Sequence, residues 1–231
     1  MKIKELLELP RVTLDEFLSF KPCWLDDEKG RRRLRYYARK LGGSADALEI
    51  LALRRIPAED RLWAVLRAEF IPDRILHEFA CRCAEDALSR IDNPDPRSIN
   101  AIAVKRRWIA GEATDEELAA ARAAAETAAD AAARTDTRAA AWAARAAAWA
   151  AAWDAARAAR AAAETAAETA AETARNAQVD MLTQMLREYV GAGEERYQLW
   201  DVKYLVEGQE GHPRGQTESR WYGLLGRHTT P

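Results

Sequence analysis

Residues 138–175 decide the fold, and they read RAAAWAARAAAWAAAWDAARAARAAAETAAETAAETAR. From Thr137 to Arg175, 23 of 39 residues are alanine, the residue with the highest intrinsic helix propensity. Because an alanine side chain loses no rotamer freedom in a helix, this segment is expected to be helical with little tertiary help. The sequence therefore predicts an all-α protein organised around an alanine-rich helix.

One face of this helix carries only methyl groups, which allows a second helix backbone to approach closely. The expected antiparallel partner is the segment 115–134, because only residues 135–137 separate the two. The methyl face consists of Ala140, Ala144, Ala147, Ala151, Ala155, Ala158 and Ala162. We therefore expect an alanine-rich helical hairpin within a multi-helix bundle.

The helical pattern continues to about Val190, where Gly191 and Gly193 stop it. A single helix over 137–190 would be roughly 80 Å long at about 1.5 Å per residue, against roughly 30 Å for the 20-residue partner. Two outcomes stay open. The helix breaks near Asn176 to Asp180, or part of it needs another partner.

The other side of the alanine helix carries tryptophan and arginine, because the heptad RAAAWAA occurs twice, at 138–144 and 145–151. Projected at 100° per residue, the tryptophans fall within about 40° of one another. Three interpretations of this row stay open: a core against the earlier helices, an exposed recognition stripe, or stacking of single-stranded nucleic acid. The row and its flanking arginines are Arg138, Trp142, Arg145, Trp149 and Trp153.

Helix start and stop signals divide the rest of the chain. Thr13 with Glu16, and Thr114 with Glu117, have the spacing of capping boxes. Ser44 is expected to cap the helix that follows two glycines. Pro57 and Pro72 have the first-turn position that proline tolerates. The expected helices span residues 13–20, 27–41, 44–55, 57–69, 72–91, 97–110 and 115–134.

Three regions follow from this division: short helices over 1–70, an alanine-rich helical domain over 71–190, and a glycine-containing aromatic arm over 191–231. In the arm, Trp200 and Tyr204 belong to an alternating pattern typical of a strand, which could turn back toward Trp221. Two strands alone are marginally stable in water, so the arm must pack on the helices or on another molecule.

The strongest basic patch is the segment 29–40, which reads KGRRRLRYYARK. Arginines interleaved with tyrosines could bind phosphates, although a charge run on a helix is more often a solvated face. The arginines of this patch are Arg31, Arg32, Arg33, Arg35 and Arg39. The shorter run at 105–107 has the same two interpretations.

No constellation predicts a catalytic, metal or cofactor site. His77 and Cys81 lie one helical turn apart and Cys23 could approach them, but structural zinc normally requires four ligands in paired clusters. Cys81 and Cys83 would point roughly 160° apart on one helix. We therefore expect buried, inert thiols and a surface histidine. The chain has no phosphate-binding loop, zinc-protease helix or nucleophile elbow, so we expect no enzyme.

Composition favours a cytoplasmic protein. The net charge is −2, from 35 basic and 37 acidic residues, so no global field steers the chain toward nucleic acid or a membrane. Its three cysteines are an odd number, which argues against a secreted disulfide framework. No targeting segment is recognisable at the N-terminus.

One stretch carries a family resemblance. It reads FACRCAEDAL at 79–88 and continues through DPRS at 95–98 into the alanine-rich helix. Over about residues 75–165 the chain resembles the immunity proteins of bacterial polymorphic toxin systems, which have relatives in phages and prophages. The resemblance implies an all-helical, non-catalytic protein that binds another protein, such as a toxin or a defence component. The resemblance does not assign a functional role to any residue of this sequence.

The leading hypothesis is thus a helical protein that occludes a protein partner. The first alternative is a structural or assembly protein, such as a homo-oligomer, in which the long helix and the arm make subunit contacts. The second is nucleic-acid binding through the segment 29–40. The expected partner-binding residues are Arg138, Trp142, Arg145, Trp149, Trp153, Trp200, Tyr204 and Trp221.

Overall fold

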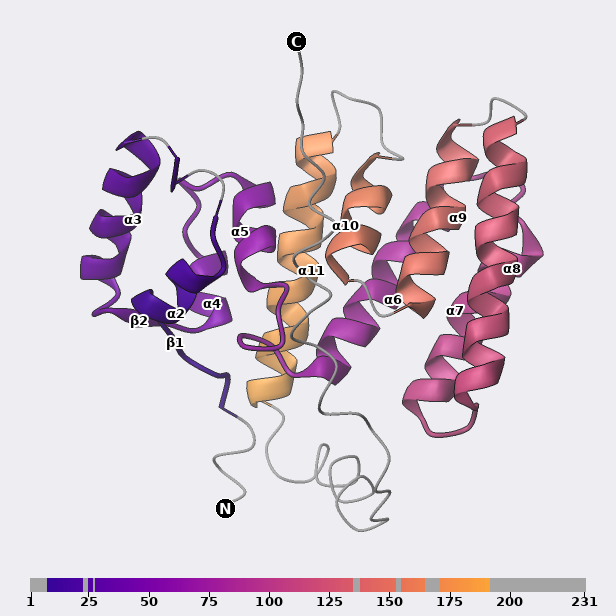
Figure 1. Ribbon diagram of the computed structural model, residues 1–231, viewed down its shortest axis with the longest axis horizontal. Helices are drawn as coiled ribbons and strands as arrows, with labels where there is room; N and C mark the ends of the chain where they lie inside the picture. The colour runs from indigo at the N-terminus through magenta and orange to yellow at the C-terminus, as the bar shows by residue number, and fades with distance from the viewer. Residues whose placement is uncertain are drawn as a thin grey trace. The chain divides into compact units, whose positions relative to one another are not determined.

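The structure, a computed structural model, describes residues 8–22, 25–26, 28–134, 138–152, 155–164 and 171–191. Within these residues it contains ten helices and one two-stranded sheet (Figure 1), which confirms the predicted all-α class. Residues up to Gly191 group into one compact unit. None of the described helices is both long enough and apolar enough to cross a membrane.

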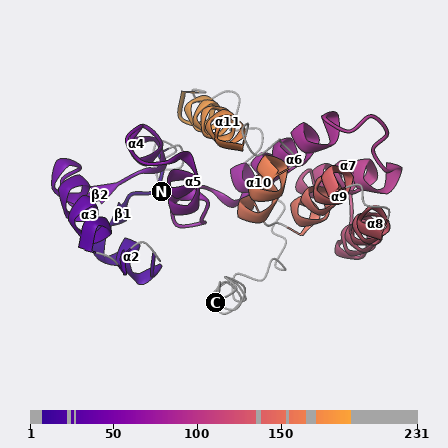
Figure 2. The same ribbon diagram turned by 90° about the horizontal axis from the view of Figure 1, so that it is seen from above.

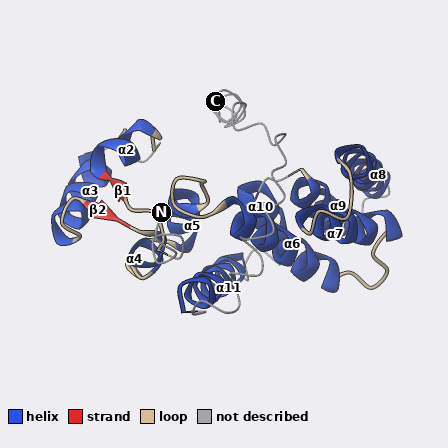
Figure 3. Cartoon of the chain, turned by 90° about the horizontal axis from the view of Figure 1, so that it is seen from below, coloured by secondary structure: helices blue, strands red, loops and turns tan. Residues whose placement is uncertain are grey.

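The first part of the unit contains short helices and the sheet. Strand β1 pairs antiparallel with β2 through Val12 opposite Ala45 and Thr13 opposite Ser44, and Figure 3 shows the pair in red. The sheet was not predicted. The elements of this first part of the unit are β1 (Val12–Thr13), α2 (Leu14–Ser19), α3 (Glu28–Lys40), β2 (Ser44–Ala45), α4 (Ala47–Leu51) and α5 (Ala58–Val65).

The predicted capping box at the first helix is confirmed. The Thr13 backbone N–H donates to the Glu16 carboxylate over 2.8 Å, and the Thr13 hydroxyl accepts from the Glu16 N–H over 3.3 Å. The predicted cap at Ser44 is wrong, because β2 uses that residue for strand pairing. Asp46 caps α4 instead, accepting from the Glu49 N–H over 2.9 Å, as a short acceptor side chain with extended backbone can.

Six further helices form the rest of the unit: α6 (Asp73–Ser89), α7 (Pro96–Ile109), α8 (Asp115–Arg134), α9 (Arg138–Ala151), α10 (Ala155–Glu164) and α11 (Ala171–Gly191). The bounds of α8 are those predicted, and α6 and α7 lie within two residues of prediction. Helix α6 packs against α7, α9 and α10. It contributes Phe79, Ala80 and Ala84, each with no exposed surface, to the core.

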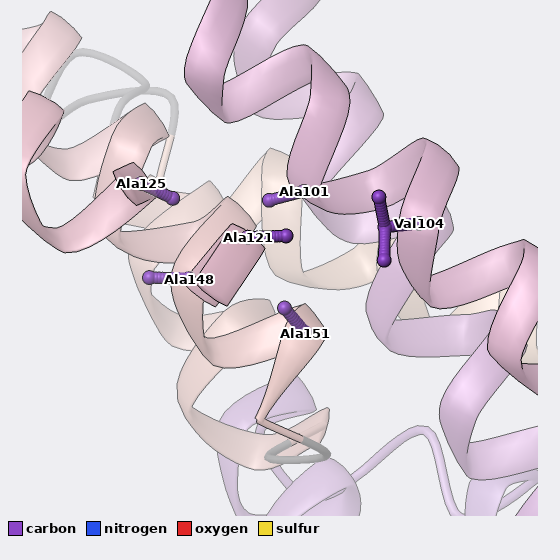
Figure 4. Packing of buried hydrophobic residues seen from close by; sticks show 6 residues of the cluster. All are labelled: Ala101, Val104, Ala121, Ala125, Ala148 and Ala151. Atoms are coloured by element: carbon purple, nitrogen blue, oxygen red, sulfur yellow. The ribbon is translucent and has the colours of Figure 1, made fainter. Parts of the chain in front are cut away.

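The predicted alanine hairpin is confirmed. Helices α8 and α9 run antiparallel and side by side (Figure 1). Ala144 and Ala151 of the predicted methyl face lie at this seam, joined by Ala148. Figure 4 shows one of the two clusters, which consists of Ala101, Val104, Ala121, Ala125, Ala148 and Ala151. Because each methyl buries little area, dispersion between closely spaced backbones must supply much of the attraction.

A single helix over 137–190, which the sequence left open, does not form. Helix α9 ends at Ala151 and α10 begins at Ala155, so the alanine-rich segment is divided. This division lets α10 pack against both α6 and α9, while α11 packs against α4 and α5 (Figure 2). The break that was left open near Asn176 to Asp180 does not form either, because α11 runs from Ala171 to Gly191. Asn176 lies inside α11, where its Nδ2 donates to the Glu172 carbonyl over 3.0 Å and its Oδ1 accepts from Arg61 over 3.2 Å.

Candidate binding surfaces

Helix α3 is the most strongly charged element of the described chain. It carries seven lysine or arginine residues and one glutamate among 13 residues. None of these 13 described residues is fully buried. The predicted basic patch therefore lies on an exposed helix, and its exposed arginines are Arg31, Arg32, Arg33, Arg35 and Arg39.

These arginines have different surroundings. The Arg31 guanidinium donates to the backbone carbonyls of Leu25 and Asp26 over 2.7 and 3.1 Å, and so it holds the start of the helix. Arg32, Arg35 and Arg39 fall within about 60° of one another when projected at 100° per residue. We call these three residues the α3 arginine face. They point away from the rest of the unit, because the opposite side of α3 lines a cavity.

That cavity, which we call the α3 cavity, has a volume of about 300 Å³ and lies between α3, the sheet, α4 and α5. Figures 1 and 2 both place the strand pair between α3 and α5. The wall is mostly apolar, and Lys29, Arg33, Asp60 and Arg61 are its charged members. Burial, with a contribution from Glu59, raises the pKa of the Asp60 carboxyl, and Arg33 opposes this. Apolar residues of the wall include Phe17, Leu34, Tyr37, Ile50, Leu53 and Phe70.

The α3 cavity was not predicted, although the sequence contained a signal for it. Leu34, Tyr37, Ala38 and Leu41 follow the i, i+3, i+4, i+7 spacing of a buried helix face. The arginines on the opposite side of the same helix dominate its sequence pattern. The elements that close the cavity from the other side meet α3 only through long-range packing, which no local pattern indicates.

The two described tryptophans of α9 are neither fully buried nor fully exposed. Trp142 and Trp149 are half-buried, and all the fully buried residues of α9 in the structure are alanines. The Arg145 guanidinium lies 5.4 Å from the Trp142 ring centroid and 4.0 Å from the Asp130 carboxylate. Arg138 is exposed. The other expected contact residues, Trp153, Trp200, Tyr204 and Trp221, lie outside the described residues.

A buried cluster between α6 and α7 replaces the predicted surface histidine. His77 is only 9 % exposed, because the Trp108 ring of α7 covers it edge-on at 5.3 Å between centroids. The Lys105 ammonium lies 3.9 Å from the centroid of the same ring. Burial lowers the pKa of Lys105 to about 8. This cluster is buried packing between α6 and α7.

The predicted burial of the two thiols is confirmed. Cys81 and Cys83 are at most 1 % exposed. Burial raises the pKa of Cys81 to about 12 and also raises that of Cys83. Cys23 lies outside the described residues. Among those described, no three histidine, cysteine, aspartate or glutamate side chains gather as metal ligands would.

The basic run at 105–107 is not an open cationic patch. Lys105 is 1 % exposed. Arg106 bridges Glu78 and Glu85 of α6, which raises the pKa of its guanidinium. Arg107 pairs with Glu117 over 3.3 Å. Arg106 and Arg107 therefore join α7 to its neighbours, and Lys105 is buried.

Comparison with protein-family models, curated proteins and solved structures finds no significant match. The resemblance to immunity proteins over residues 75–165 therefore stays a prediction. Two described surfaces differ from ordinary packed helix: the α3 arginine face and the α3 cavity behind it.

Proposed function

We propose that the chain is a non-catalytic binding protein that occludes an acidic surface of a protein partner through the α3 arginine face. The supporting observation is the concentration of charge. Arg32, Arg35 and Arg39 are exposed on one sector of a helix that has no fully buried residue, in a chain whose net charge is only −2.

Arginine chemistry favours carboxylates on the partner. The planar guanidinium presents a rigid fork of donors that can bind a carboxylate with two parallel hydrogen bonds. Several such groups on one face speed association with an acidic surface and disfavour basic ones. Tyr36 beside them is 52 % exposed, and tyrosine and arginine are the residue types enriched at binding hot spots.

The resemblance to immunity proteins agrees with one-to-one occlusion of a toxin or defence component. In this proposal the half-buried Trp142 and its neighbour Arg145 form a second, smaller contact. The α3 arginine face is the primary contact because its side chains are exposed without rearrangement of the unit.

Charge-matched variants test the proposal. Arg32→Gln/Arg35→Gln/Arg39→Gln removes the α3 arginine face. Its control, Arg55→Gln/Arg134→Gln/Arg187→Gln, removes three exposed arginines elsewhere. Tagged wild-type protein would capture its partner from nuclease-treated lysate of the native host, and the purified partner would be titrated against each variant.

We expect the α3 variant to weaken affinity for the captured partner at least about ten-fold and the control to stay within about two-fold. Circular dichroism would verify that both variants keep their helices. Equal weakening by both triples would show a general charge effect, and full affinity of the α3 variant would show that another surface binds. Either result contradicts the proposal.

Nucleic-acid binding is the second candidate, because Tyr36 lies among the exposed arginines of α3 and could stack on a base. Its signature is salt dependence. If the three arginines of the α3 face neutralise about three phosphates of a single strand, log affinity should fall with log salt with a slope of about −2. Fluorescence anisotropy with labelled oligo(dT) measures this slope, and a shallow slope or wild-type affinity in the α3 variant contradicts it.

A further inference from the structure

The α3 cavity is an apolar hollow that reaches the protein surface, because Lys29 and Arg33 of its wall are exposed. Elsewhere protein cores are packed about as densely as organic crystals, and voids larger than a water molecule are few. An apolar cavity does not hold water well, because water needs two to four polar partners. A volume of about 300 Å³ is instead at the lower end of the range for small-molecule sites.

The wall of the cavity fits an apolar chain. Phe17 from α2, Leu34 and Tyr37 from α3, Ile50 from α4 and Phe70 after α5 face the same space. Phe17 and Phe70 are within edge-on contact at 6.5 Å between centroids, which makes that end of the wall continuous and aromatic. A flexible alkyl chain fills such an irregular apolar space without leaving polar groups unsatisfied.

The charges at the cavity indicate what kind of headgroup a bound alkyl chain would carry. Lys29 and Arg33 lie four residues apart on α3, so both cations are on one side of the helix. Arg61 is committed elsewhere, because its guanidinium donates to the backbone carbonyls of Leu51 and Ile56 over 2.6 and 3.0 Å. Asp60 is the acid among the charged wall residues, and it lies in the field of Arg33. The available charge at the cavity is therefore positive.

We infer that the α3 cavity binds one molecule of a free medium-chain carboxylate, with its alkyl chain against the apolar wall and its headgroup at Lys29 and Arg33. This site lies on the opposite side of α3 from the arginine face, and it does not depend on the proposed function. The alkyl chain supplies the binding energy through burial of apolar surface, and the two cations select the carboxylate.

The test is calorimetric titration of the full chain with dodecanoate, dodecanol and dodecylammonium, each below its aggregation concentration. The wild type is expected to bind dodecanoate at one site, about ten-fold more tightly than dodecanol. Lys29→Gln/Arg33→Gln should remove this preference. Ala38→Phe, which fills the cavity from α3, should abolish binding of both.

Arg32→Gln/Arg35→Gln on the arginine face of the same helix is the matched control, and it should bind dodecanoate like the wild type. This control also separates the two proposals, because it weakens partner binding only. Should Ala38→Phe lose helical signal, Ile50→Phe fills the cavity from α4 instead.

Four results overturn the inference. Three come from the titrations: the absence of saturable dodecanoate binding by the wild type, tighter binding of dodecylammonium, and unchanged dodecanoate affinity in a folded cavity-filling variant. Co-sedimentation with anionic lipid vesicles by a chain that fails to bind monomeric dodecanoate also overturns it, since a membrane surface would then be the ligand.

Discussion

The Lys105 ammonium lies 3.9 Å from the centroid of the Trp108 ring, one turn further along α7. The negative face of the indole attracts the cation and explains how a lysine with 1 % exposure is tolerated in the helix interior. The attraction offsets only part of the cost of burial, because burial still lowers the pKa of Lys105 to about 8.

Replacement of this lysine should stabilise the fold. Lys105→Met keeps the side-chain length and removes a buried charge. We expect it to raise the free energy of unfolding at pH 7 by about 1–3 kcal/mol, as measured by guanidinium denaturation. Lys40→Met, at an exposed position on α3, controls for the loss of a lysine as such. A destabilised Lys105→Met would show that the ammonium makes a needed polar contact.

The stability difference between Lys105→Met and the wild type should depend on pH. Below pH 8 Lys105 is charged in both the folded and unfolded states, and the full cost of burying the charge is present. Between pH 8 and about 10.5 the unfolded chain holds the proton that the folded chain has lost, so stability rises with pH. The advantage of Lys105→Met over the wild type should therefore narrow by about 1 kcal/mol between pH 7 and 9. A constant difference would contradict the lowered pKa.

The alanine seam should not accept larger side chains. Ala125 of α8 has no exposed surface and lies in the cluster that joins α7, α8 and α9. Ala125→Leu forces the helices apart and should lower the free energy of unfolding by about 1–3 kcal/mol. Ala120→Leu, on the exposed side of the same helix, should change it by less than about 0.5 kcal/mol. Equal effects of the two substitutions would mean that the seam is not closely packed.

The capping box at the start of α8 should be measurable. The Thr114 hydroxyl accepts from the Glu117 N–H over 3.2 Å, and the Thr114 N–H donates to the Glu117 carboxylate over 2.8 Å. Thr114→Ala removes the first bond and should cost about 1 kcal/mol in thermal or chemical denaturation. Thr114→Ser keeps the hydroxyl and should restore most of this stability. If serine is no better than alanine, the hydroxyl does not cap the helix.

The buried thiols should be inert in the folded state. At pH 8 a thiol with a pKa of about 12, such as Cys81, is a thiolate in roughly one molecule in ten thousand. In a Cys23→Ser background, Ellman's reagent should find both remaining thiols unreactive in native protein and reactive in denaturant. Rapid reaction of one thiol without denaturant would place it in an accessible pocket.

Local signals predicted the described helices well where the relevant physics is local. The capping boxes at Thr13 and Thr114 and the bounds of α8 depend on residues three positions apart or on single turns. Gly42 and Gly111 have φ values of 72° and 73°, as expected for residues that end helices in the left-handed region.

The remaining features depend on contacts between distant residues. The alanines of 138–163 are equally good helix formers, so their pattern does not indicate that α9 ends at Ala151. The sheet joins two-residue strands separated by more than 30 positions, which are too short for a periodic signal. His77 is buried because the Trp108 ring covers it, and Trp108 lies on another helix. The apolar spacing on α3 indicates a covered side of this helix, but the elements that form the cavity with it, α4 and α5, follow from no local pattern.

Helix α9 consists of two copies of one heptad, RAAAWAA, and nothing else. Seven residues make about two turns, and each copy is rotated by only about 20° from the one before. Recombination that inserts or deletes one copy therefore lengthens or shortens the helix by about 10 Å while each tryptophan keeps its direction and each methyl face stays toward α8. A change in length by one or two residues would instead turn the tryptophans and the methyl face away from their present directions.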